Sequence, residues 1–516
     1  MHQFEIVIAL LLVGALLAMV ARRLCAPHPA LLALAGTAGA VVPGLPEIAL
    51  DPDLALALFV APTLLDAAYD SSPRDLKDNW VPVAGLVVVC VLCTTAAVAV
   101  VARWIEPGMP WAAAVALGAI VAPPDASAAT AVLRQLRPPR RVLVILEGES
   151  LLNDATALLV YRVAVGAAAT GAFNGWMLVP TLLLTCGGGA VLGAVLAKLY
   201  FRCFGRLDDI AISVLVQFLG TFAAWLIAER LGVSAIITMV AYAITIARHA
   251  PVRSDARHRR SSYAVWEVAV FVLNALAFIL IGLQLRGILM RLDGGGWRDA
   301  LFAGAACAAV VLVRIAWVMG YNTVIRWKIR RFGVRLPRPM QLPSWQGGLI
   351  IPWCGMRGIV TLAAGLALPE GFPFRDLILL TAFSVVLVTL VAQGLTLRWL
   401  LDRLRLEDDG SVEREVELAR VETARAALAV LPPTGEAAAA MLRQDYEARL
   451  RPATTTGGEG ARLAALQAEA VAAQRRRLSA LRSENRIGDA AFHLMEEEVD
   501  LLELSADPRL RPGGAE

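Results

Sequence analysis

Long apolar stretches separated by short polar loops make up most of the first 400 or so residues of the chain. Each stretch has roughly 17–27 residues, which is long enough for a helix to cross the hydrocarbon core of a bilayer. Because every backbone group must be hydrogen-bonded in lipid, we expect an all-α polytopic membrane protein of about 13 transmembrane helices. The expected spans cover residues 4–21, 29–46, 53–70, 80–104, 111–134, 142–168, 176–203, 209–229, 232–248, 262–285, 299–325, 345–368 and 376–401.

The composition supports this architecture and shows that the last part of the chain differs from the rest. Hydrophobic residues make up 58% of the 516 positions and charged residues only 18%, against about 25% charge in soluble domains. Much of the charge falls after residue 405, where segments 412–430, 436–450 and 461–481 have amphipathic helical spacing. We therefore expect a transmembrane domain over residues 1–405 and a cytoplasmic helical tail over residues 406–516.

Arginine and lysine concentrate in alternate loops. The loops after odd-numbered spans are basic, beginning with Arg22 and Arg23, whereas the loops after even-numbered spans carry few positive charges. The exception is the loop around residues 285–298, which contains Arg286, Arg291 and Arg298. Basic loops stay in the cytoplasm, so we expect the N-terminus outside, the C-terminus inside, and location in the plasma (inner) membrane. The first apolar run lacks a basic leader and precedes Arg22 directly, which favours a retained span over a signal peptide.

The fifth span contains two adjacent prolines, Pro123 and Pro124, followed by Asp125. Two missing backbone donors predict that the helix breaks near its middle. Broken helices near the bilayer midplane mark ion sites in secondary transporters, and inverted repeats place a second break in the other half of the protein. Two segments fit that second break, residues 354–358 and residues 392–394, and the sequence does not choose between them.

The sixth span carries polar side chains at a depth where lipid-facing helices are apolar: Glu147, Glu149, Ser150, Asn153 and Asp154. An ionisable group there costs at least a few kcal/mol, so its default interpretation is functional. Positions four or seven apart share a helix face, which places Glu147, Ser150 and Asp154 together. Glu149 and Asn153 lie on the adjacent face.

These faces suggest two different roles. Arg357 lies between two glycines in an apolar run, and we predict that it forms a buried ion pair with Glu149. Asp154 then has no assigned cation, and burial disfavours its charged form. A proton or a small hard cation can neutralise Asp154, but both cannot bind at once. This competition, with Na⁺ held by oxygens of Asp154 and Ser150, predicts obligate exchange of one monovalent cation for one proton.

Other charges within the spans have simpler interpretations. We expect Glu267 and Arg314 to pair with each other across helices, and Arg162 to extend toward the membrane surface. Asp66 either lines the cavity or lies at a helix end near the cytoplasmic face.

Taken together, these motifs resemble bacterial Na⁺/H⁺ antiporters of the monovalent cation:proton antiporter family, the NhaP-type relatives of sodium/hydrogen exchangers. The resemblance covers about residues 1–405. It rests on Ala122-Pro123-Pro124-Asp125 with Ala128-Ala129-Thr130, on Glu147-Gly148-Glu149-Ser150-Leu151-Leu152-Asn153-Asp154, and on Gly355-Met356-Arg357-Gly358.

The resemblance implies a fold of thirteen helices with inverted repeats, a homodimer, and ion and proton binding at Asp154 with Ser150 and Asp125. It also implies that Asn153 matches the asparagine of electroneutral members, and that Glu149 and Arg357 form the family's structural ion pair. It further implies that Glu147, Thr130 and Asp66 line the cavity. At the position of Asp66, relatives often carry glutamate.

We therefore expect a secondary antiporter that exchanges cytoplasmic Na⁺ or Li⁺ for external H⁺ and serves pH homeostasis. K⁺/H⁺ exchange is the close alternative. We expect no cofactor besides the transported ions, no nucleic acid, and the lipid bilayer as surroundings. An intramembrane hydrolase needs a base beside Ser150, and no histidine lies at that depth. A cation channel would favour a pore loop or a ring of charges over one buried carboxylate.

Overall fold

The computed structural model divides into two compact units, Met1–Asp408 and Asp409–Glu516, which are described separately. All regular elements in its described residues are helices, in agreement with the all-α prediction. The described residues are 2–24, 26–42, 51–125, 129–130, 133, 138–170, 178–205, 207, 209–253, 256–291, 296–333, 344–404, 410–431, 437–450, 459–484, 495, 498–499 and 501–502.

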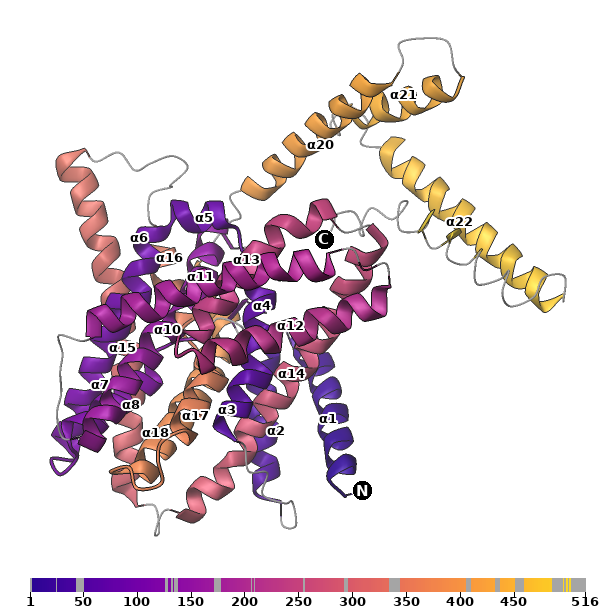
Figure 1. Cartoon of the computed structure of the whole chain (residues 1–516). Coiled ribbons are helices and arrows are strands. Elements are labelled where there is room, and N and C mark those ends of the chain that lie inside the picture. Colours follow the sequence, from indigo (N-terminus) through magenta and orange to yellow (C-terminus); the bar gives the residue numbers. More distant parts are fainter. Residues whose placement is uncertain are drawn as a thin grey trace. The chain divides into compact units, whose positions relative to one another are not determined.

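Most helices of the first unit lie within the apolar stretches of the sequence, and the short charged helix α5 is an exception (Figure 1). Its first half contains α1 (His2–Leu24), α2 (His28–Ala40), α3 (Pro52–Ala55), α4 (Ala61–Asp70), α5 (Pro73–Asp78), α6 (Trp80–Ala84), α7 (Val91–Ile105), α8 (Trp111–Val121) and α10 (Arg140–Thr170). Its second half contains α11 (Leu178–Phe204), α12 (Ile210–Arg230), α13 (Ala235–Arg253), α14 (Ala256–Arg291), α15 (Trp297–Phe332), α16 (Trp345–Trp353), α17 (Ile359–Leu366), α18 (Arg375–Val388) and α19 (Gly394–Leu404).

Several of these helices join end to end through short π-helical turns. The turns η1 (Leu56–Val60), η2 (Gly85–Cys90) and η4 (Thr389–Gln393) connect α3 to α4, α6 to α7, and α18 to α19. Within the described residues, seven helical stretches are long and apolar enough to cross a membrane, and three shorter apolar helices accompany them. Helix α10 is not among the seven although it has 31 residues, and it is the helix that carries the carboxylate cluster.

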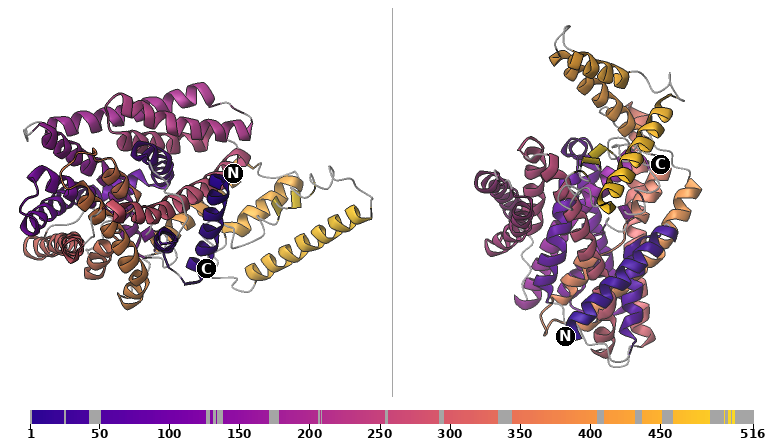
Figure 2. Two further views of the ribbon diagram at one scale, coloured as in Figure 1. Left: turned by 90° about the horizontal axis from the view of Figure 1, so that it is seen from below. Right: turned by 90° about the vertical axis from the view of Figure 1, so that its right-hand side faces the viewer.

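Close helix crossings depend on glycine, as two examples show. A Cβ on Gly36 of α2 would meet the backbone of α14 at Ile279 and Gly282, so only glycine allows the two helices to approach so closely. A Cβ on Gly193 of α11 would similarly meet the backbone of α13 at Thr238. Figure 2 shows α11, α12 and α13, in magenta, together along one side of the bundle.

In the described residues of the second unit, three long helices lie at the positions that amphipathic spacing predicted. They are α20 (Ser411–Val430), α21 (Ala437–Leu450) and α22 (Glu459–Ser483). Val471, Leu478 and Val499 form a small buried cluster in this unit.

Candidate functional site

Two interrupted helices meet in the interior of the first unit. Helix α8 ends at Val121 and residues 122–125 are not helical, because Pro123 and Pro124 cannot donate backbone hydrogen bonds. Residues 354–358 separate α16 from α17, so the second break lies there. At the other candidate segment the helix continues, through the π-helical turn η4. The two breaks are hydrogen-bonded to each other, since the Asp125 N–H donates to the Met356 carbonyl at 2.6 Å.

Arg357 neutralises the end of α8. Its guanidinium donates from Nε to the Val121 carbonyl at 3.1 Å, from Nη2 to the Ala122 carbonyl at 3.2 Å, and from Nη1 to the Gly355 carbonyl. The last carbonyls of a helix have no intrahelical donor and carry partial negative charge. Arg357, only 1% exposed, thus supplies the donors that the broken helix lost.

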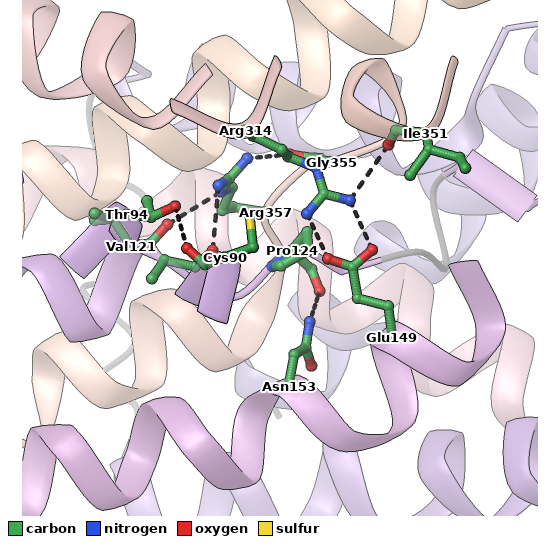
Figure 3. A network of polar contacts seen from close by, with 11 residues as sticks. Cys90, Thr94, Val121, Pro124, Glu149, Asn153, Arg314, Ile351, Gly355 and Arg357 are labelled. Carbon is green, nitrogen blue, oxygen red and sulfur yellow. Dashed lines mark hydrogen bonds and ion pairs between the residues drawn. The ribbon is translucent and has the colours of Figure 1, made fainter. Parts of the chain in front are cut away.

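The buried ion pair joins Glu149 to Arg314, which corrects two sequence predictions. Arg314 of α15 donates from Nη1 to Glu149 Oε1, and from Nη2 to Glu149 Oε2 at 2.7 Å. Its Nη2 also contacts the Ile351 carbonyl at 3.3 Å. The predicted Glu149–Arg357 pair is wrong because Arg357 faces the α8 carbonyls instead (Figure 3). The predicted Glu267–Arg314 pair is wrong because Glu267 is exposed on α14.

The two glycines that flank Met356 and Arg357 make room for charged side chains. A Cβ on Gly355 would lie 2.6 Å from Cδ and 3.0 Å from Cζ of Arg314, so the guanidinium crosses where a side chain would stand. A Cβ on Gly358 would overlap the Asp125 carboxylate. Asp125 therefore lies against the N-terminal end of α17, where the helix dipole favours a negative charge.

Asn153 connects α10 to the first break. It is fully buried, and its Nδ2 donates to the Pro124 carbonyl at 2.6 Å. Its side chain thereby satisfies a carbonyl that the interrupted helix leaves without an intrahelical donor. Its Oδ1 is buried and has no hydrogen-bond partner within the described part of the chain.

Asp154 lies one residue further along α10 and is 9% exposed. It is close enough to Asp125 for the two carboxylates to interact electrostatically. Among the described residues no ion pair includes Asp154, in contrast to Glu149. Ser150, one helical turn before Asp154, is half-buried. The site thus combines two neighbouring carboxylates, a hydroxyl, an amide and the backbone of two broken helices.

The remaining predicted residues occupy less decisive positions. Glu147 on α10 and Asp66 on α4 are half-buried, and the two helices contact each other. Thr130 is also half-buried, and Arg162 is exposed. The motif residue Ala128 lies outside the described residues.

Arg314 is the residue whose role the sequence analysis missed. The sequence around Arg314 did indicate this role, because a single arginine within an otherwise apolar run needs a carboxylate partner inside the protein. Thr389 was also missed, and its Oγ1 accepts a hydrogen bond from the Arg357 N–H at 3.1 Å. No local pattern marks a threonine inside an apolar helix as a partner for another helix.

The chain is similar to known membrane proteins over most of its length. A family model described as "Sodium/hydrogen exchanger, transmembrane" matches residues 7–403. A Mycobacterium tuberculosis protein named as an uncharacterized Na(+)/H(+) exchanger is 30% identical over 95% of this chain and 93% of its own length. A Bacillus subtilis sodium, potassium, lithium and rubidium/H(+) antiporter is 30% identical over 71% of this chain and 56% of its own. The sodium proton antiporter MjNhaP1 of Methanocaldococcus jannaschii, 17% identical, shares the fold with a TM-score of 0.60 over 78% of this chain and 99% of its own.

Proposed function

Because the chain belongs to the sodium/hydrogen exchanger family, as its motifs predicted, we propose that it exchanges Na⁺ or Li⁺ for H⁺ at Asp154. The observation that carries this proposal is the contrast between two buried carboxylates on α10. Glu149 is neutralised by Arg314, whereas no ion pair in the described part of the chain includes Asp154. A carboxylate of that kind requires a mobile cation or a proton.

The neighbours of Asp154 support a small hard cation as the alternative to the proton. Ser150 lies one turn away on the same face, and the Asn153 Oδ1 has no hydrogen-bond partner among the described residues. Asp125 adds a second nearby carboxylate. Carboxylate, hydroxyl and amide oxygens are ligands that hard cations prefer. Thr130, Glu147 and Asp66 are candidates for the cavity that leads to this site.

Obligate exchange follows because the site is energetically unfavourable when neither a proton nor a cation is bound. When neither ion is bound, Asp154 is a buried negative charge that no ion pair among the described residues neutralises, and moving that state through the protein is expensive. The site therefore crosses occupied, with a proton in one direction and a cation in the other. Since Asn153 is neutral and holds the Pro124 carbonyl, one proton exchanges for one monovalent cation without net charge movement.

Potassium is the second candidate substrate. The Bacillus subtilis relative is named for potassium and rubidium as well as sodium and lithium, so a related chain accepts larger ions. We favour sodium because the family model that matches residues 7–403 is described as a sodium/hydrogen exchanger. We further propose that the protein acts as a homodimer in the plasma membrane, with its C-terminal helices in the cytoplasm.

Dye-quenching in inverted membrane vesicles tests the function. A preformed pH gradient should collapse when Na⁺ or Li⁺ is added, and the collapse should be unchanged when an imposed potassium–valinomycin voltage is varied. Asp402→Asn, which changes an exposed carboxylate on α19, is a matched control for Asp154→Asn. Exchange that depends on voltage would contradict electroneutrality, and a response to K⁺ alone would replace the sodium assignment.

A further inference from the structure

A cavity whose lining does not include Asp154 lies in the first unit. It has a volume of about 180 Å³, and its walls are formed by α6, η2, α10, α15 and α16. These elements contact one another at the end of the unit where Arg140, Arg141, Arg326 and Lys328 lie. The labels of Figure 1 show α6 and α16 near each other at that end. We call this space the basic-end cavity.

The lining of the basic-end cavity changes from polar to apolar along its length. Its polar members, Arg141, Tyr321, Asn322 and Ser344, all lie on the loop side, where Pro82, Pro139 and Val142 also line it. Further in, the wall is apolar throughout and consists of Ile145, Val318 and Ile351, with Leu86 and Trp317 beside them. The step from Arg141 to Ile145 is four residues, or about 6 Å along a helix.

This gradient has the polarity of a membrane lipid in the adjoining leaflet. The cationic, hydroxyl and amide groups lie on the loop side and the apolar side chains lie further in, which is the order of the headgroup and the acyl chain in a lipid. An apolar cavity of roughly 150 Å³ is large enough for a benzene-sized group, so this one accepts a short length of acyl chain. We propose that the basic-end cavity binds an anionic amphiphile, with its phosphate or carboxylate at Arg141 and its acyl chain against Ile145 and Val318.

A molecule bound in this cavity would contact the helices that carry the buried ion pair of Glu149 and Arg314. Ile145 is one turn before Glu149 on α10, and Trp317 is three residues after Arg314 on α15. Ile351 lines the cavity, and its carbonyl accepts from Arg314 at 3.3 Å. A bound acyl chain therefore packs against the three helices that hold Glu149 and Arg314. The amphiphile stabilises this part of the protein whichever ion is transported.

The experiment uses the full chain, purified in neutral detergent and stripped of lipid. Apparent melting temperature and lipid retention by native mass spectrometry are followed while matched lipids are added. Dioleoylphosphatidylglycerol is compared with dioleoylphosphatidylcholine, and oleate with oleyl alcohol, so that each pair differs in charge. We expect the charged member of at least one pair to raise the melting temperature more and to be retained, and the pair that responds identifies a phospholipid or a free fatty acid.

Two variants and one control locate the effect. Arg141→Gln should weaken the charged lipid's binding roughly tenfold, the cost of one charge-assisted hydrogen bond. Val318→Phe, which fills the apolar end, should abolish retention. Arg330→Gln removes an exposed charge nine residues from Tyr321, on the opposite helix face, and should change nothing.

Equal responses to the charged and neutral members of both pairs would overturn the proposal. Retention of the charged lipid undiminished in Arg141→Gln would also overturn it. If Arg141→Gln does not fold, Val318→Phe decides: unchanged retention in that variant refutes the site, and lost retention supports it.

Discussion

Replacing Arg314 with methionine is the most informative perturbation of the interior. The side chains of Arg314 and Glu149 are 3% and 2% exposed, and the guanidinium contacts both carboxylate oxygens. Arg314→Met leaves Glu149 buried with an uncompensated charge, which typically costs about 3–5 kcal/mol. Glu149→Gln leaves Arg314 in the same position and should cost a similar amount.

The double variant separates this pair from the pairing predicted from sequence. When Glu149→Gln and Arg314→Met are combined, neither buried charge remains, so the loss should be smaller than the sum of the single losses. Contacting residues typically couple by about 0.5–3 kcal/mol, and we expect this pair near the upper end. The cycle of Glu149→Gln with Arg357→Met should give a smaller coupling, because Arg357 donates to the Val121 and Ala122 carbonyls instead.

The assay is the unfolding midpoint of each purified variant in mixed detergent and dodecyl sulfate micelles. Transport by the same preparations distinguishes a lost fold from a lost site. A coupling energy that is larger for Arg357 than for Arg314 would refute the corrected pairing. Additive losses for Glu149 and Arg314 would refute it equally, since a pair that contributes nothing shows no coupling.

Three further substitutions test the geometry of the broken helices. Gly355→Ala should destabilise the protein by roughly 1–3 kcal/mol, because the new Cβ would meet the guanidinium of Arg314. Gly371→Ala is the control and should have little effect, because the space around Gly371 is open. The unfolding midpoints of the two variants compare them. Gly358→Ala should displace the Asp125 carboxylate and lower the rate of cation-driven proton movement more than it lowers yield; full activity would contradict that placement. Asn153→Ala should cost roughly 1–3 kcal/mol by leaving the Pro124 carbonyl without a donor, and an unshifted unfolding midpoint would show that the hydrogen bond is dispensable.

Local chemistry allowed much of this arrangement to be predicted. Adjacent prolines remove backbone donors wherever they occur, so the end of α8 at Val121 followed from Pro123 and Pro124. Spacing by four residues along one helix fixes which side chains share a face, so the placement of Ser150 beside Asp154 needed no tertiary information. The apolar stretches likewise indicated the helices from their lengths.

The ion-pair partner depends on how separate helices face each other, and no local pattern encodes that. Arg357 and Arg314 both lie in apolar runs, and either could reach Glu149 in principle. In the structure, Arg357 donates its hydrogen bonds to the free carbonyls at the end of α8. Arg314 can reach Glu149 because Gly355 has no side chain in its way. The second break was undecided for a related reason. Residues 392–394 contain a glycine, but the helix continues there through η4.

Competition between a proton and an alkali cation at Asp154 is tested most directly by proton release. Purified protein in weakly buffered detergent is mixed with NaCl, and released protons are recorded with a pH indicator, with choline chloride as the control. The account predicts proton release by the wild type and by Asp402→Asn, and none by Asp154→Asn when all three are folded. Release that persists in folded Asp154→Asn would contradict the account, because the exchanged proton would then reside on another group.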